Sequence, residues 1–221
     1  MTPFRDGRRA LGLTTLVAGL GAAAAAVVLA VQSASPPADA GRVPVAEPAP
    51  SAAPTKTSTA GTARAARRAV ELPAWSAPTR VSIAALGIDA AAQAVGVGPD
   101  RALDVPENPE KLGWWIGSAT PGSPRGTVLI AGHVDTAEDG RGALFRLERL
   151  PIGAPIEVRA GDRTITYRTV ARRSYDKQRL PKTLFNAGAA PQLALVTCGG
   201  TFKDGVYSHN VVVYAEPAGS R

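Results

Sequence analysis

Short apolar runs separated by glycine and proline make up most of residues 80–221. Runs of this length, rich in Val, Ile, Leu and Thr, are typical of β-strands. They lie at 81–86, 127–131, 156–159, 164–170, 193–197 and 211–215. Gly161-Asp162 joins two of them and is a hairpin signal, while helical signals are confined to 142–149 and a turn at Leu184-Phe185. The pattern predicts an all-β domain, in which a closed or nearly closed barrel buries the short strands.

A longer apolar run covers residues 11–31 and is interrupted by only two threonines. As a helix, its 21 residues span about 31 Å, close to the ~30 Å hydrocarbon core of a bilayer. Basic residues precede the run at Arg5, Arg8 and Arg9, and the next one comes at Arg42. The positive-inside rule therefore predicts a cytoplasmic segment 1–10, a transmembrane anchor 11–31 and an extracellular chain beyond it.

A cleaved signal peptide is the alternative interpretation of this run. Ala38-Asp39-Ala40 would be its A-x-A-like cleavage site. The apolar run exceeds the usual length of a signal core, about 7–15 residues, and the site lies well beyond it. We therefore favour a single-pass anchor in the cell membrane, and both interpretations place the domain outside the cytoplasm.

The segment 32–79 separates the predicted anchor from the predicted domain. It holds eight prolines among many alanines, serines and threonines. Such a composition has too little apolar surface to offset the entropy of ordering. We expect a disordered linker that reaches about 40 Å from the membrane. Residues 80–221 then form one domain of ordinary size.

The positive charge of the chain gathers upstream of the predicted domain. The whole chain has a net charge of +7, whereas residues 80–221 hold 17 Lys and Arg against 14 Asp and Glu. A basic arm is compatible with nucleic acid or with an anionic surface. Because these basic residues flank an apolar segment, we expect a lipid or cell-wall surface and no nucleic acid.

Cys198 is the one cysteine of the sequence, so an intramolecular disulfide is impossible. It follows the apolar run 193–197, and Gly199-Gly200 comes directly after it. A cysteine in such a run is commonly a small buried hydrophobe. An unpaired thiol outside the cytoplasm is nevertheless open to oxidation, so its presence favours a chemical role.

His133 ends another apolar run in the same way, after 127–131 and Gly132. Neighbouring strands of a barrel would bring this imidazole and the Cys198 thiol to one rim, where the imidazole can activate the thiol. Glycines beside a nucleophile leave room for a substrate backbone and leave N–H groups free to face an oxyanion. His209, the second histidine, is the rival base.

Three segments resemble the sortase family of cysteine transpeptidases. Residues 195–200, Leu-Val-Thr-Cys-Gly-Gly, resemble the cysteine motif at a strand end, and residues 131–135 resemble the Gly-His motif. Residues 210–215 are similar to the last barrel strand, and the resemblance covers about residues 80–215. The TCGG form is most similar to class F, or the neighbouring class E, of actinobacteria. The resemblance implies a closed sortase-like barrel of about eight strands with one or two short helices.

The resemblance also implies an activity. Cys198 would attack an LPxTG-like sorting signal of a secreted protein, and the thioacyl-enzyme would pass to an amine of a cell-wall precursor. His133 would act as acid and base, and no cofactor or metal is implied. Residues next to the nucleophile, and one arginine in the preceding loop, would contact the substrate: Thr197, Gly199, Gly200 and Arg179.

One departure from the family pattern concerns its arginine. Sortases generally carry an arginine in the last strand, whereas Arg221 is the one arginine after the cysteine here. Asn210 stands at the corresponding position, and its amide can donate to an oxyanion. The alternative is an arginine from the loop before the cysteine strand, namely Arg172, Arg173 or Arg179.

Two other functions remain open from the sequence. An L,D-transpeptidase is also β-rich, but its histidine stands close before the cysteine, where this chain has Leu195-Val196-Thr197. A non-catalytic, membrane-tethered β-domain for adhesion or scaffolding would explain the absent arginine. Trp114-Trp115 is expected either to pack in the core or to line a peptide groove.

Overall fold

The computed structural model describes residues 39–44, 76–98 and 102–219. The predicted cytoplasmic segment 1–10, the anchor 11–31 and most of the linker lie outside these residues. Within the described ranges, no helix has both the length and the hydropathy to cross a membrane.

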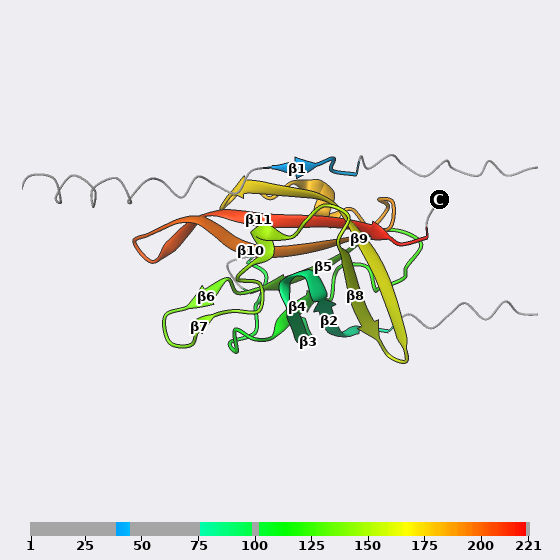
Figure 1. Ribbon diagram of the computed structural model, residues 1–221, viewed down its shortest axis with the longest axis horizontal. Coiled ribbons are helices and arrows are strands. Elements are labelled where there is room, and N and C mark those ends of the chain that lie inside the picture. Colours follow the sequence, from blue (N-terminus) through cyan, green and yellow to red (C-terminus); the bar gives the residue numbers. More distant parts are fainter. Residues whose placement is uncertain (1–38, 45–75, 99–101, 220–221) are drawn as a thin grey trace, which may run out of the picture. The chain divides into compact units, whose positions relative to one another are not determined.

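Eight strands close into a barrel, as the sequence predicts (Figure 1). Their order is β9-β11-β10-β5-β4-β3-β2-β8, and β8 pairs back onto β9 to complete the circle. The strands are β2 (Pro78–Ile83), β3 (Ile88–Val95), β4 (Leu112–Trp115), β5 (Thr127–Gly132), β8 (Pro155–Ala160), β9 (Arg163–Asp176), β10 (Gln192–Lys203) and β11 (Val206–Pro217). A separate small hairpin pairs β6 (Asp135–Thr136) with β7 (Gly140–Arg141).

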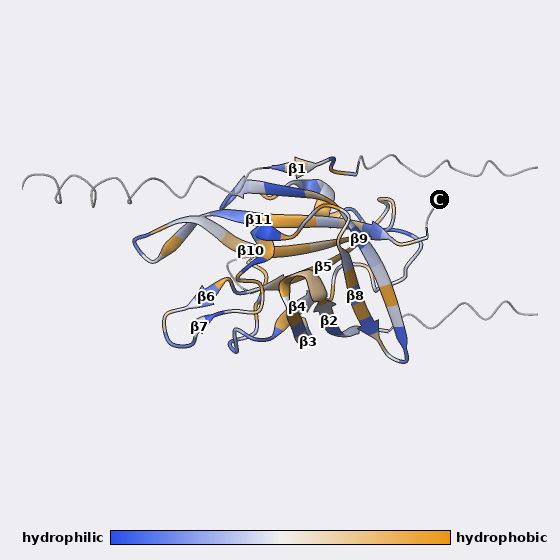
Figure 2. Ribbon diagram, in the orientation of Figure 1, coloured by the Kyte–Doolittle hydropathy of each residue, from blue (hydrophilic) through white to orange (hydrophobic). Residues whose placement is uncertain are grey.

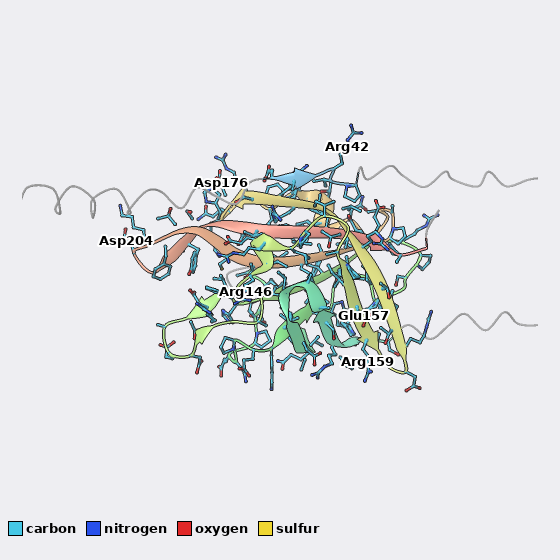
Figure 3. The ribbon with its side chains drawn as sticks, in the orientation of Figure 1. Arg42, Arg146, Glu157, Arg159, Asp176 and Asp204 are labelled. Carbon is cyan, nitrogen blue, oxygen red and sulfur yellow. The ribbon has the colours of Figure 1, made fainter. Side chains whose placement is uncertain are left out.

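Buried and exposed residues alternate along strand β8, because one face of the strand is in contact with solvent. Ile156 and Val158 are fully buried in the barrel interior, whereas the neighbouring positions 155, 157 and 159 are exposed. Figure 3 places the charged side chains of Glu157 and Arg159 on the outside of this strand. Period-two burial of this kind is the expected pattern of a sheet with one wet face.

Strands β5, β10 and β11 are instead buried on both faces. Val128 and Ile130 of β5 belong to the cluster inside the barrel, while Leu129 and Ala131 belong to a second cluster on the outer face. Figure 2 shows the resulting apolar colour along β10 and β11. Burial on two sides explains why these segments read as continuous apolar runs. The second cluster extends to the cavity beside Cys198 that is described below, and its β5 residues line that cavity.

A short strand from the predicted linker joins the sheet. Strand β1 (Ala40–Gly41) pairs antiparallel with β9, beyond the point where β8 leaves that edge. Arg173 donates from Nη1 to Ala40 O at 2.6 Å and from Nη2 to Gly41 O at 2.7 Å. This pairing departs from the prediction of one disordered linker over 32–79, because backbone bonds and Arg173 stabilise a segment with little hydrophobic surface.

An Arg173→Ala variant tests how β1 is held. Without the guanidinium, β1 keeps its ladder bonds but loses two charge-assisted bonds, which are worth about 1.5–3 kcal/mol each when well formed. We expect the Arg42 amide, which donates to Val170 O, to exchange its hydrogen at least about tenfold faster. Hydrogen exchange read by mass spectrometry measures this rate. An unchanged rate would show that the ladder alone holds the strand.

In the part of the chain that the structure describes, the helical segments are short 3-10 turns: η2 (Ala84–Leu86), η3 (Leu147–Arg149) and η4 (Lys182–Phe185). The helix expected over 142–149 is therefore wrong except at its end. Its first N–H groups bond to other loops, since Gly142 N donates to Val134 O and Leu144 N to His133 O. The strand expected over 81–86 likewise ends at Ile83, where η2 begins.

Candidate active site

Cys198 lies in β10 near the end of its pairing with β5. The two strands are parallel, and Val196 opposite Ala131 is their last paired position. The buried Thr197 continues the contact, because its hydroxyl donates to Gly132 O at 2.8 Å. Cys198 is the next residue of β10, and His133 directly follows the end of β5 at Gly132. The structure thus brings both to one end of the barrel, as the two strand-end motifs predict.

The imidazole of His133 is oriented by the loop before β4. Its Nε2 atom lies 3.1 Å from Pro106 O. A carbonyl oxygen can only accept, so Nε2 carries a hydrogen in this arrangement and Nδ1 is left to exchange a proton. The main chain of His133 is also fixed, since its carbonyl accepts from Leu144 N at 3.2 Å.

A lysine that the sequence does not single out contacts the thiol. Lys177 follows β9 directly, and its Nζ donates to Cys198 Sγ at 2.8 Å and to Asn210 Oδ1 at 3.3 Å. Sheet register produces this contact, because Cys198 pairs with Asn210, and Asn210 pairs with Tyr175 on β9. Lys177 can be identified as a neighbour of Cys198 only from this register of three strands.

Asn210 is buried beside the thiol and contacts Lys177 through both ends of its amide. Its Nδ2 donates to Lys177 O at 2.8 Å, while its Oδ1 accepts from Nζ. The Nδ2 nitrogen carries two hydrogens, so the second one is a candidate donor to a bound substrate. Asn210 therefore lies beside Cys198, and its side chain contacts Lys177.

The three candidate arginines contact other parts of the molecule. Arg172 donates to Leu150 O, and Arg173 holds β1. Arg179 has a highly exposed side chain and lies 3.6 Å from Asp176 Oδ2. Among the described contacts of these arginines, none reaches Cys198, so the structure places Arg179 in the neighbouring loop without joining it to the thiol.

A largely apolar cavity of about 400 Å³ opens on one side of Cys198. Its floor comes from β5 and β10, and its walls come from the loop after β3 and the loop after β9. Apolar wall residues include Val97, Leu103, Val105, Trp115, Leu180 and Phe185. Trp114 packs in the core, as one of the two expectations has it, whereas Trp115 lines this cavity.

A smaller, more polar cavity of about 160 Å³ lies on the other side of the same residue. Glu148 and Arg149 from η3 line it together with Gly199, Gly200 and Tyr207. Cys198 and Thr197 line both cavities. Cys198 is thus accessible from both cavities.

Gly200 allows the strand to turn away after the nucleophile. Its φ is 79°, in the left-handed region, and a Cβ there would come 2.6 Å from His209 Nδ1. The ladder between β10 and β11 is irregular between Gly199 and Phe202. A side chain at this position would be strained and would clash, so glycine is required for this shape.

Tyr207 ties the β10–β11 hairpin to the turn after His133. Its hydroxyl donates to Asp135 Oδ2 at 2.6 Å. Partial burial, this hydrogen bond, and the charges of Asp135 and Cys198 raise the pKa of Tyr207 to about 12. The phenol is therefore protonated at physiological pH and continues to donate to Asp135.

His209 occupies a separate position on β11, opposite Gly199. Its Nδ1 lies 2.7 Å from Ser208 Oγ, and its Nε2 lies 3.5 Å from Asp176 Oδ1. Both ring nitrogens thus have partners away from the sulfur. This arrangement favours His133 over His209 as the acid and base.

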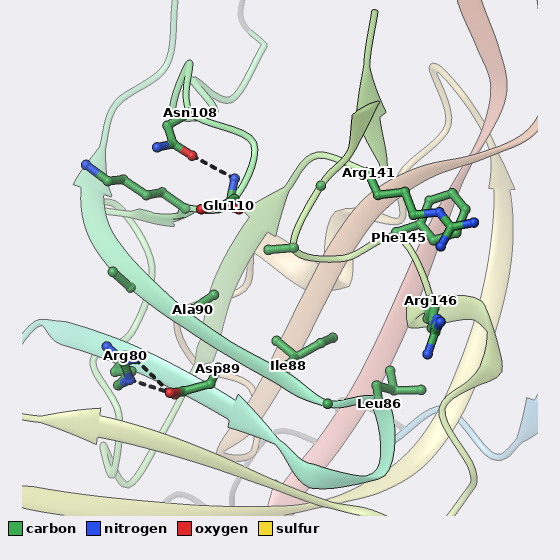
Figure 4. A pocket seen from close by; sticks show the side chains of 15 residues that line it. Arg80, Leu86, Ile88, Asp89, Ala90, Asn108, Glu110, Arg141, Phe145 and Arg146 are labelled. Atoms are coloured by element: carbon green, nitrogen blue, oxygen red, sulfur yellow. Dashed lines mark hydrogen bonds and ion pairs between the residues drawn. The ribbon is translucent and has the colours of Figure 1, made fainter. Parts of the chain in front are cut away.

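A larger cavity, of about 630 Å³, lies elsewhere, between β2, β3 and the segment after β7 (Figure 4). Arg80 and Asp89 form a bidentate pair there at 2.6 and 2.7 Å. Hydrogen bonds from Arg80 and Ser82 lower the pKa of Asp89 to about 2. Neither Cys198 nor His133 lines this cavity, so its size does not identify the reactive site.

Comparisons with known proteins agree with this fold. A family model described as Sortase domain matches residues 81–218. Among solved structures, sortase A from Corynebacterium diphtheriae is 20% identical, with a TM-score of 0.51 over 66% of this chain and 63% of that one. Sortase C1 from Streptococcus suis is 14% identical, with a TM-score of 0.51 over 65% and 74%. Comparison with curated proteins finds no match.

The family match covers more than half of the chain, so the protein belongs to the sortase family. The structural likenesses, at this identity, show the fold alone. Members of the family are cysteine transpeptidases, and Cys198 is the one cysteine of this chain.

Proposed function

We propose that this sortase-family protein is a membrane-anchored transpeptidase that joins secreted proteins to a cell-wall amine outside the cytoplasm. One observation carries the proposal: Cys198 contacts a cationic group and lines two cavities, with His133 directly after the end of the neighbouring strand β5. A non-catalytic adhesion domain has no need for this arrangement. The class F or class E assignment, the actinobacterial source and the LPxTG-like motif are part of the proposal and rest on the sequence motifs.

The first half-reaction forms a thioester. The Cys198 thiolate attacks the carbonyl carbon of the Thr–Gly bond, so that a C–S bond forms and the carbonyl oxygen becomes negative. When the C–N bond breaks, the departing amine takes a proton from His133. Backbone N–H groups near Gly199 and Gly200, with the Asn210 amide, are the candidate donors to the oxyanion.

The second half-reaction reverses these roles. An acceptor amine attacks the thioester carbon and gives a proton to His133, and the C–S bond breaks to release the thiolate. The apolar cavity suits the apolar residues of a sorting signal. The polar cavity on the other side, which Glu148 lines, suits an approaching amine.

The function is tested by a peptide assay on the full chain in detergent. A set of pentapeptides of the LPxTG type is incubated with and without hydroxylamine, which is a small acceptor nucleophile. The proposal expects a thioester on Cys198 by mass spectrometry and a hydroxamate product after hydroxylamine is added. If no peptide of the set acylates Cys198, the transpeptidase function is wrong for these substrates, and a tethering role takes its place.

An Asn210→Ala variant measures the amide's part in this reaction. A donor that bonds the oxyanion mainly in the transition state should leave KM nearly unchanged, while kcat falls about 10²-fold. Steady-state kinetics of peptide cleavage give both constants. An unchanged kcat would remove Asn210 from the site.

A double-mutant cycle with Lys177→Met separates two roles for Asn210. If the amide acts directly on the oxyanion, the loss persists in the Lys177→Met background. If Asn210 only positions the lysine, through Oδ1 and Nδ2, its removal costs nothing further there.

A further inference from the structure

We infer that Lys177 is a catalytic residue that supplies the positive charge beside the Cys198 nucleophile. The inference deepens the proposed transpeptidase function and assigns to this chain the charge that sortases generally take from an arginine. The lysine touches the reacting atom itself, since its Nζ donates to Sγ at 2.8 Å.

The contact has a direct chemical consequence. The thiolate is the nucleophilic form of cysteine, and a neighbouring ammonium group favours it over the thiol. An ammonium group has three hydrogens. One is directed at Sγ and one at Asn210 Oδ1, so a third remains for the oxygen that becomes negative during attack. Lys177 therefore contacts the sulfur before the attack and has a hydrogen for the oxygen that becomes negative during it.

The backbone of Lys177 is held on both sides. Its N–H donates to Ser208 O at 3.0 Å, and its carbonyl accepts from Asn210 Nδ2 at 2.8 Å. These bonds extend the pairing between β9 and β11 past the end of β9. A long side chain that starts from a fixed backbone loses less entropy on reaching the sulfur, so the ammonium is preorganised.

The carboxylate next to Lys177 in the sequence contacts other residues. Asp176 precedes Lys177, but its oxygens face Arg179 Nη1 at 3.6 Å and His209 Nε2 at 3.5 Å. Between residues that the structure describes, no ion pair joins Lys177 to a carboxylate. The charge of the lysine is thus directed at the thiol and at a neutral amide.

Alkylation of Cys198 by iodoacetamide tests the inference without a peptide substrate. The rate at pH 7 reports the reactive thiolate, because Cys198 is the one cysteine of the chain. We expect Lys177→Met to lower this rate at least about tenfold and Lys177→Arg, which keeps the charge, to retain most of it. Lys203→Met, at an exposed position of the β10–β11 hairpin, is the matched control and should react like the wild type.

The outcomes separate this inference from the proposed function. A Lys177→Met rate within twofold of wild type overturns the inference, and so does an equal loss in Lys177→Arg. Thermal unfolding identifies a variant that fails to fold, in which case Lys177→Gln is judged by the same criterion. If the wild type alkylates rapidly but cleaves no sorting peptide, the transpeptidase function fails while the role of Lys177 at the thiol stands.

Discussion

Cys198→Ala is expected to abolish cleavage of every sorting peptide that the wild-type chain accepts. The covalent step needs a nucleophile at this position, and alanine has none. The substitution replaces a thiol by a hydrogen on a half-buried side chain, so the barrel should remain folded. Peptide cleavage followed by chromatography measures the loss, and mass spectrometry checks that no thioester forms.

Circular dichroism and thermal unfolding of the same variant provide the control. Loss of cleavage with an unchanged unfolding temperature assigns the effect to chemistry. Cleavage by the alanine variant at a measurable fraction of the wild-type rate would exclude Cys198 as the nucleophile. The reaction would then have to be assigned to another residue or to a contaminating peptidase.

His133→Ala should lower kcat/KM at least about 10²-fold, the usual scale of general acid–base catalysis. In the proposed reaction the departing amine needs a proton, and the imidazole of His133, directly after β5, is the proposed source. Its hydrogen bond to Pro106 O leaves Nδ1 for the exchange. The rate should be measured across pH, because loss of the acid and base also flattens the pH profile.

His209→Ala is the matched control for that experiment. This histidine lies on β11 opposite Gly199 and contacts Ser208 and Asp176, so its removal should change the rate only slightly. Equal losses in the two variants, or a greater loss in His209→Ala, would reverse the assignment of acid and base.

Most of the barrel could be predicted because its strands are marked by apolar runs. The runs at 127–131 and 193–197 correspond to β5 and β10, which are buried on both faces. Strand β4 was not predicted, because its four residues include a glycine. Strand β1 could not be predicted either, since an Ala-Gly pair carries no hydrophobic signal and is stabilised by a side chain far along the chain.

The candidate site could likewise be predicted only in part from the sequence. Cys198 and His133 could be predicted, since each follows an apolar strand and a short motif surrounds it. Lys177 could not, because it lies in a polar loop where nothing distinguishes it from the neighbouring Arg179. Its contact with the thiol arises from the register of β9, β11 and β10, which only the folded sheet reveals.

The pairing of β1 with β9 determines where a shortened chain should begin. A chain shortened to begin at Arg80 loses β1 and also the first two residues of β2. The edge of β9 near Ala171 and Arg172 would then present unpaired N–H and C=O groups to solvent. Uncovered edges of this kind invite strand exchange between molecules and aggregation. Asp39, whose carboxylate accepts from Ser174 N, is therefore a better starting residue for a monomeric preparation.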